Sequence, residues 1–255
     1  QLRAEGRGLD ELEPLHRAYE LLAELYSGHY QADGKPFVCH GVGVASILGW
    51  LGMPAEMLTV GMLHNVYGNA DFGDGRQGAA TRSRRDVVRQ VVGARVETLV
   101  FRFRSLRITA RSIDGFMARL EELDRDDRAL LVVDLADLLE KNTDLGALYF
   151  GDGRWVLEQL EGFGVKAVEL ARRLEQPALA AALESAFTEV RQAATGFPPE
   201  LRASGGRKYM QLVVPRSCRR RMRARLGATT QRLRGRARRM RRSRGPSGGA
   251  APART

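Results

Sequence analysis

The chain has 255 residues, 44% of them hydrophobic, which is ample for a folded core in one large domain or two small ones and excludes a largely unfolded protein. The two cysteines, Cys39 and Cys218, lie far apart, so no disulfide framework is implied and a reducing cytoplasm is favoured. No run approaches the about 18 apolar residues of a membrane span, and the polar start, Gln1–Asp10, does not resemble a signal peptide, so we expect a soluble protein.

The net charge of +11 is concentrated at one end of the chain. Residues 216–255 contain fifteen Arg and no Lys, Asp or Glu. Taking these fifteen from the 41 basic residues leaves 26 against 30 acidic ones, so residues 1–215 carry a net charge of −4. The basic character therefore belongs to the tail and not to the expected folded body.

Apolar residues recur at spacings of three and four along most of the chain, which is the period of an α-helix. We therefore predict an all-α body over residues 11–195, preceded by an N-terminal extension over 1–10. The first helices are expected at 11–27, from Val38 to Leu51 and from Ala55 to Val66. The third of these is apolar almost all round, so we expect it at the centre of the domain.

Residues 68–82 are rich in Gly, Asp and Asn, which predicts a loop that leaves the end of the third helix open to solvent. A functional site is expected there. The segment 99–106 alternates like a strand, so a strand competes with a helix at that point. The later helices are expected at 83–92, 94–104, 112–123, 127–145, 153–175 and 177–194.

The last sixty residues have a different character. Residues 196–215 form a connecting segment richer in Pro and Gly, in which Tyr209–Val214 suits one short strand or a packing arm. Residues 216–255 offer too few apolar side chains to offset the entropy of ordering them, so we predict a disordered basic C-terminal tail.

Three segments resemble, in order, the HD-domain superfamily, and most of all the guanosine tetra/pentaphosphate hydrolase domain of the RelA/SpoT proteins. That family has a Gly-x-Pro-aromatic-x-x-His run followed by Val-Ala-x-Ile-Leu, then Leu-Leu-His-Asp, then Lys-Leu-Ala-Asp-Arg-Leu. The corresponding segments here are Gly34–His40 with Val44–Leu48, Gly61–Asn65, and Val132–Leu139. The resemblance spans residues 15–145 and implies an HD-domain-like helical bundle.

The loop residues Tyr67–Gly73 are similar to an uncharacterised HD-like family of actinobacteria. This second resemblance implies a divergent member of the fold and lends no function.

The resemblance implies a divalent metal, Mn, Fe, Zn, Co or Ni, held by His40, His64, Asn65 and Asp137. Imidazoles and carboxylates from three helices hold an ion that acidifies a water and orients a phosphate ester or anhydride. Asn65 stands where the family has aspartate, and its amide lacks the negative charge that such an ion prefers. The family's catalytic Glu-Asp pair is replaced by Gly68 and Asn69, so the motif is degenerate.

Several of these residues have plainer interpretations. Asp71 and Asp74 are weak candidates for a catalytic carboxylate, provided that their loop folds inward. Asp134 and Asp137 share a helix face at a spacing of three, where they either serve the site or pair with charges on a neighbouring helix. The arginines of residues 82–111 either line an anion-binding surface or lie on solvated helix faces.

Three functions stay open. The leading interpretation is an HD-like domain that binds or hydrolyses a phosphorylated small molecule or nucleotide, as a metal-dependent phosphohydrolase if it is an enzyme. The second is a catalytically inactive regulatory or interaction module with the same fold. The third is a nucleic-acid-binding protein that uses the basic tail, without base stacking, because no aromatic residue interleaves the arginines.

Overall fold

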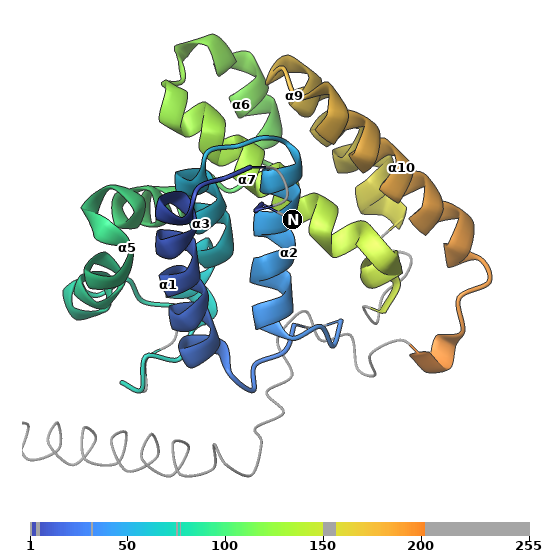
Figure 1. Cartoon of the computed structure of the whole chain (residues 1–255). Helices are drawn as coiled ribbons and strands as arrows, with labels where there is room; N and C mark the ends of the chain where they lie inside the picture. Colours follow the sequence, from blue (N-terminus) through green and yellow to red (C-terminus); the bar gives the residue numbers. More distant parts are fainter. Residues whose placement is uncertain are drawn as a thin grey trace, which may run out of the picture.

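A computed structural model describes residues 2–3, 6–31, 33–74, 76, 78–149 and 157–201. Within these ranges the chain is all-α: it has no strand, and one isolated bridge joins Tyr30 to Pro36 (Figure 1). The predicted all-α class is confirmed. The predictions for Tyr209–Val214 and for the tail over residues 216–255 lie outside the described residues.

The helical elements follow one another with short connections. They are α1 (Leu9–Tyr26), α2 (Phe37–Trp50), α3 (Ala55–Leu63), α4 (Val66–Asn69), α5 (Arg82–Phe103), α6 (Ile113–Ala118), η1 (Leu120–Glu122), α7 (Arg125–Asn142), η2 (Thr143–Tyr149), η3 (Leu160–Gly164), α9 (Val165–Arg173), α10 (Pro177–Ala194) and η4 (Pro199–Leu201).

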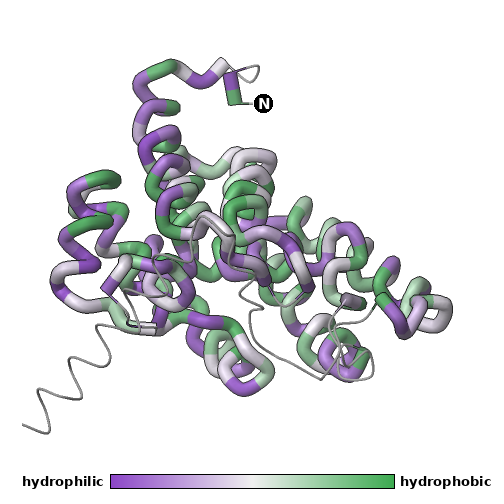
Figure 2. Tube along the Cα trace, turned by 90° about the horizontal axis from the view of Figure 1, so that it is seen from below, coloured by the Kyte–Doolittle hydropathy of each residue, from purple (hydrophilic) through white to green (hydrophobic). Residues whose placement is uncertain are grey.

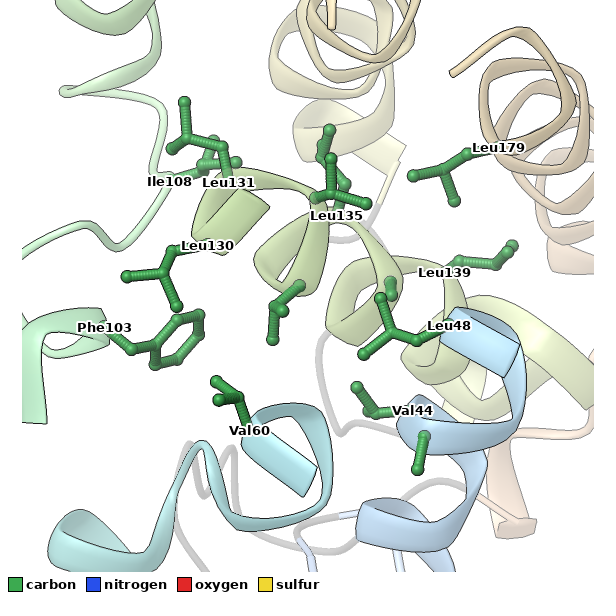
Figure 3. Packing of buried hydrophobic residues seen from close by; sticks show 14 of the residues in the cluster. Val44, Leu48, Val60, Phe103, Ile108, Leu130, Leu131, Leu135, Leu139 and Leu179 are labelled. Atoms are coloured by element: carbon green, nitrogen blue, oxygen red, sulfur yellow. The ribbon is translucent and has the colours of Figure 1, made fainter. Parts of the chain in front are cut away.

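Helices α3 and α7 form the centre of the molecule. Helix α3 contacts α1, α2, α5 and α7, and all its residues from Met57 to Leu63 are buried, as predicted. Helix α7 contacts α2, α3 and α5 and also the C-terminal pair α9 and α10, so it joins the two parts of the bundle (Figure 1). Figure 3 shows side chains of α7 packed among residues of these neighbours, including Val60, Phe103 and Leu179.

Each outer helix has one apolar and one polar face. In Figure 2 hydrophobic and hydrophilic residues alternate along the helical turns, and the buried hydrophobic residues form one cluster that runs from Ala18 to Ala194. None of the helices in the described part of the chain is both long enough and apolar enough to cross a membrane.

Glycines bring α2 and α3 close together. A Cβ atom on Gly41 would lie 2.8 Å from the carbonyl oxygen of Met62, and one on Gly61 would collide with Leu48. At position 41 only glycine allows this approach, since a larger residue would meet the backbone of Met62, whereas at position 61 a larger residue would displace the side chain of Leu48. The close packing places His40, on the first turn of α2, near His64, which follows α3.

Most helix boundaries agree with the predictions to within a few residues. The predicted break between 92 and 94 is a kink inside α5, where Gly93 has φ 85°. The segment 99–103 is helical, so the competing strand is wrong there. The third helix ends at Leu63 and not at Val66, because Asn65, with φ −97° and ψ 5°, leaves the helical path before α4 begins.

Candidate metal centre

Three of the four predicted ligands converge in the core. His40 lies on α2, His64 after α3 and Asp137 in the middle of α7, and their side chains are at most 2% exposed. One potential ligand atom from each lies within 4.8 Å of the others. His40 Nε2 is 3.3 Å from His64 Nε2, and Asp137 Oδ1 is 3.1 Å and 3.4 Å from these two nitrogens.

The outer nitrogen of each imidazole has an acceptor that fixes the tautomer. His64 Nδ1 donates to the carbonyl oxygen of Gly61 at 2.6 Å, and His40 Nδ1 donates to a carboxylate oxygen of Glu140. Because a carbonyl and a carboxylate only accept, both Nδ1 atoms carry the proton. In the neutral rings each Nε2 therefore presents a lone pair toward Asp137.

The third group in this space is also an acceptor. Asp137 Oδ1 is buried and makes no hydrogen bond, although a buried carboxylate oxygen without a partner is costly. Two imidazole lone pairs and one carboxylate oxygen thus face one another, an arrangement that a divalent cation satisfies. The residues present fit such an ion.

The other oxygen of Asp137 is held by two cations. Lys141 Nζ lies 2.6 Å from Oδ2, and an amino group of Arg107 lies 3.3 Å from it. Burial acts to raise the pKa of Asp137, but Lys141 and the imidazole of His64 outweigh it, so this pKa lies well below its usual range. The carboxylate is therefore ionised and leaves Oδ1 for a ligand.

The two imidazoles differ in basicity. Burial lowers the pKa of His64, which favours the neutral form that binds metals. Burial also acts to lower the pKa of His40, but the neighbouring carboxylates of Asp137 and Glu140 outweigh it and this pKa is raised. When no cation is bound, His40 Nε2 can carry a proton that lies between this nitrogen and Asp137 Oδ1, in the position of the metal.

Glu140 is the residue that the sequence analysis missed. It lies one turn after Asp137 on α7, is 5% exposed, and combines the bond to His40 with an ion pair of 2.6 Å to Lys35. A carboxylate behind a ligating histidine orients the ring and raises its basicity. The signal was available, since Glu140 continues the spacing of three set by Asp134 and Asp137.

Asn65 reaches the site, but its amide oxygen faces away from the histidines. Its Nδ2 donates to His64 Nε2 at 2.7 Å, while Oδ1 accepts from Arg107 at 3.2 Å. Because a guanidinium only donates, Arg107 fixes this orientation of the amide. In this arrangement the amide of Asn65 occupies the lone pair of His64 Nε2 and offers no oxygen to a metal, so an ion can bind His64 only when the Asn65 side chain turns away.

Asp134 holds the connection between α5 and α6 against α7. One oxygen pairs with Arg107 Nε at 3.0 Å, and the other accepts from the backbone N–H of Ile108. Burial raises the pKa of Asp134 to about 6 even though Arg107 opposes it. Asp134 therefore positions Arg107 beside the site, which resolves the two interpretations of this carboxylate.

The two weak catalytic candidates lie outside this group. Asp74 pairs with the buried Arg84 at 2.5 Å and 3.0 Å, which holds the pKa of that carboxyl near 2. Asp71 accepts from the backbone N–H of Gly73 at 2.8 Å in the same loop. Neither belongs to the group of His40, His64 and Asp137.

Most arginines of residues 82–111 are engaged with carboxylates. Arg85 and Arg89 bind the fully buried Glu97, which also accepts from Tyr67, while Arg95 binds Asp126. Because these guanidinium groups bind carboxylates of the protein itself, they do not form a broad anion-binding surface. Arg107 differs because its partners are those of the candidate metal centre.

Comparisons with known proteins cover part of the chain. Residues 21–107, 87 of the 255 residues, match the family model described as "Domain of unknown function (DUF6817)". That range contains His40, His64, Asn65 and Arg107, whereas Asp137 and Glu140 lie beyond it.

Short stretches are similar to curated enzymes. One of 62 residues is 36% identical to the "Putative GTP diphosphokinase RSH1, chloroplastic" of Arabidopsis thaliana, and another of that length is 31% identical to the "GTP pyrophosphokinase" of Streptomyces coelicolor. A stretch of 63 residues is 36% identical to the corresponding RSH1 protein of Oryza sativa subsp. japonica. These matches cover 24–25% of this chain and 7% of each relative, so similarity to RelA/SpoT-type proteins is shown over a short stretch only.

Proposed function

We propose that this chain is a metal-binding domain of HD type that binds, and in its active form hydrolyses, a phosphorylated small molecule. The observation that supports the proposal is the convergence of two imidazole lone pairs and Asp137 Oδ1, each ring being fixed from behind by an acceptor. Bound there, a divalent ion acidifies a water and polarises a phosphoryl oxygen. The names of the relatives, GTP diphosphokinase and GTP pyrophosphokinase, favour a guanosine nucleotide as the first ligand to test.

The residues of the chain then have distinct roles. His40, His64 and Asp137 hold the ion, while Glu140 and the carbonyl of Gly61 keep both rings in the required tautomer. Asn65 and Arg107 border the same space, where a substrate on the ion would lie beside them. No carboxylate among the described residues joins the three ligands to take a proton from the attacking water, so the expected hydrolysis is slow.

A second function is favoured by that missing carboxylate. Gly68 and Asn69 lie on α4, directly after the site, where the resembling hydrolases carry an acidic pair. A module that keeps the metal and binds a nucleotide without cleaving it would have these features. The two functions differ in turnover and not in metal binding.

The test of the metal site is elemental analysis of the purified chain, followed by melting curves with Mn, Fe, Zn, Co and Ni. A ligand that binds only the folded state stabilises it, so a bound metal raises the melting temperature. His64→Ala should abolish this increase, whereas His16→Ala, on the exposed face of α1, should retain it. If no metal is found and none stabilises the protein, the proposal is wrong.

Asn65→Asp tests the degenerate position. An aspartate would add a negative charge beside His64 and keep an acceptor for Arg107, so metal affinity should increase. Assays on guanosine nucleotides, phosphomonoesters and pyrophosphates then separate the hydrolase from the binding module. Unchanged metal affinity in this variant would show that position 65 does not contact the ion.

A further inference from the structure

A cavity of about 350 Å³ lies between α1, α2 and α3, where the N-terminal segment packs on α2. A Cβ atom on Gly49 would lie 3.2 Å from Leu2 Cδ2, and the N-terminus lies beside α2 in Figure 1. The walls of the cavity carry aliphatic side chains from all three helices, among them Leu15, Val42 and Leu58. The cavity is therefore suited to the apolar part of a ligand.

This cavity is separate from the candidate metal centre. Val42, Ala45 and Ser46, which line it, lie on the face of α2 opposite His40, because successive residues of an α-helix turn by about 100°. A ligand in the cavity would thus occupy the far side of α2 and use none of the metal-binding groups. The site stands or falls independently of the proposed function.

The volume of the cavity sets the size of its ligand. An apolar cavity of about 150 Å³ holds one benzene molecule. The cavity beside α2, at about 350 Å³, is slightly more than twice as large and has room for about a dozen carbon atoms. It therefore fits a medium-length alkyl chain.

One cation lies at this cavity without a counterion. Ser46 and Arg3 are the polar residues among those that line it, and the Ser46 hydroxyl donates to the carbonyl oxygen of Val42 at 2.9 Å within the same helix. Arg7 pairs with Glu11 at 3.9 Å, whereas the exposed Arg3 has no partner among the residues that the structure describes. No carboxylate lines the cavity either, so the guanidinium of Arg3 is complementary to an anionic group on the ligand.

We infer that this cavity binds an aliphatic carboxylate of about ten to twelve carbon atoms. The alkyl chain lies between α1, α2 and α3, and the carboxylate lies at the open side beside Arg3. The walls supply affinity by removing the chain from water, and the guanidinium selects the acid over uncharged compounds of the same length.

The test is calorimetric titration of the full chain with straight-chain carboxylates of increasing length. Each methylene that enters the cavity should increase affinity by about fourfold, so octanoate should bind about 16-fold more tightly than hexanoate. The gain should stop near dodecanoate, because a longer chain extends into solvent. Decanoate should bind up to about fivefold more tightly than 1-decanol, the range expected for one exposed ion pair.

Ala45→Leu tests the location of the site. Ala45 is 5% exposed and lines the cavity, so a leucine there should fill it. Decanoate binding should be lost, while the melting temperature stays the same or rises, as for other substitutions that fill cavities. Ala181→Leu, on the exposed face of α10, is the matched control and should retain binding.

Arg3→Met tests the anionic group and does not depend on the folding of the first variant, because Arg3 is exposed. Decanoate should then bind no more tightly than 1-decanol, and the affinity for 1-decanol should be unchanged. The control is Arg125→Met, which removes an exposed arginine from the first turn of α7 and should leave both affinities unaltered.

Three results would overturn the inference. The first is an affinity that does not depend on chain length. The second is binding of several decanoate molecules per chain that persists in Ala45→Leu, which indicates non-specific adsorption of a surfactant. The third is a dimer in sedimentation analysis that Ala45→Leu dissociates while decanoate fails to bind, which would assign the cavity to a second copy of the chain.

Discussion

Glu140 governs how His40 presents its ring to the candidate metal. Its carboxylate accepts from His40 Nδ1 and is fixed in turn by Lys35, so the ring is held by a chain of buried contacts. Burial acts to raise the pKa of Glu140, but His40 and Lys35 outweigh it and the pKa is lowered. The negative charge is thus retained behind the ligand, where it increases the basicity of His40 Nε2.

Glu140→Gln tests this role. The amide oxygen can still accept from His40 Nδ1, but the charge is lost and Lys35 loses its buried partner. We expect metal affinity to fall by about 10- to 100-fold, as for other carboxylates behind ligating histidines. Titration with Zn²⁺ or Mn²⁺ followed by calorimetry measures the change.

The matched control for this variant is Glu121→Gln. Glu121 is 82% exposed and pairs only weakly with Arg128, so the same chemical change should leave metal affinity unaltered. A Glu140→Gln protein with wild-type affinity would mean that His40 needs no carboxylate behind it.

At the residue scale the sequence identified ligands better than their supporting groups. His40, His64 and Asp137 were found because their neighbours resemble known motifs, and the structure brings the three together. The orientation of Asn65 could not be predicted, because it depends on Arg107, 42 residues further along the chain. Contacts over such separations depend on how α3, α5 and α7 pack, which no local pattern encodes.

At the scale of whole helices, the site depends on a close crossing between α2 and α7. Gly43 lies on α2, one turn after His40, and faces Glu140: a Cβ atom there would lie 2.8 Å from Glu140 Cγ and 3.0 Å from Oε1. The missing side chain therefore provides the space in which Glu140 reaches His40.

Gly43→Ala should disturb the metal site without changing any ligand. Alanine favours the helix by about 1 kcal/mol over glycine, but here its methyl group would displace Glu140 from His40. We expect a loss of about 10-fold in metal affinity, the lower limit for loss of a group that orients a ligand. Calorimetric titration of both proteins with the same metal measures it.

Gly115→Ala on α6 is the control that separates displacement of Glu140 from the general effect of replacing a helical glycine by alanine. A Cβ at Gly115 meets nothing within 4 Å, so this substitution should leave metal affinity unchanged and stabilise the fold slightly. If Gly43→Ala also leaves metal affinity unchanged, the close contact between Gly43 and Glu140 is not needed for metal binding.

Helix positions could be predicted where they depend on the pattern of residues close together in the sequence. The period of three to four residues located α1, α2, α7 and α10, and Gly93 marked the kink in α5. The alternation in segment 99–106 has a different origin: Phe103 is buried, whereas Arg102 and Arg104 reach outward to Asp124 and to the ring of Phe101. These contacts belong to the end of a helix. The alternation of apolar and charged residues there could not distinguish this helix end from a strand.

At the scale of the whole molecule, charge is divided unequally. Residues 1–215 carry a net charge of −4 and residues 216–255 carry +15. Within the described residues, the arginines at 84, 85, 89, 95, 102 and 107 pair with carboxylates, so these six do not add to a basic surface for a polyanion. Any affinity for nucleic acid should therefore come from the C-terminal segment.

Truncation after Pro215 tests that expectation. The full chain should bind duplex DNA at low salt without sequence preference, because fifteen arginines can replace the counterions of the phosphate backbone. Its affinity should fall by about 0.9 log unit per phosphate contact for each log unit of added salt. The truncated chain should show no such binding in fluorescence anisotropy, since an acidic body repels DNA.

Metal binding provides the internal control for the truncated chain. All residues of the candidate metal centre precede Pro215, so the shortened protein should keep the melting temperature and metal affinity of the full chain. Equal DNA affinity in both proteins would place the polyanion site on the folded body. If Arg107, which lies beside the candidate metal centre, belongs to that polyanion site, phosphate should compete with DNA for binding.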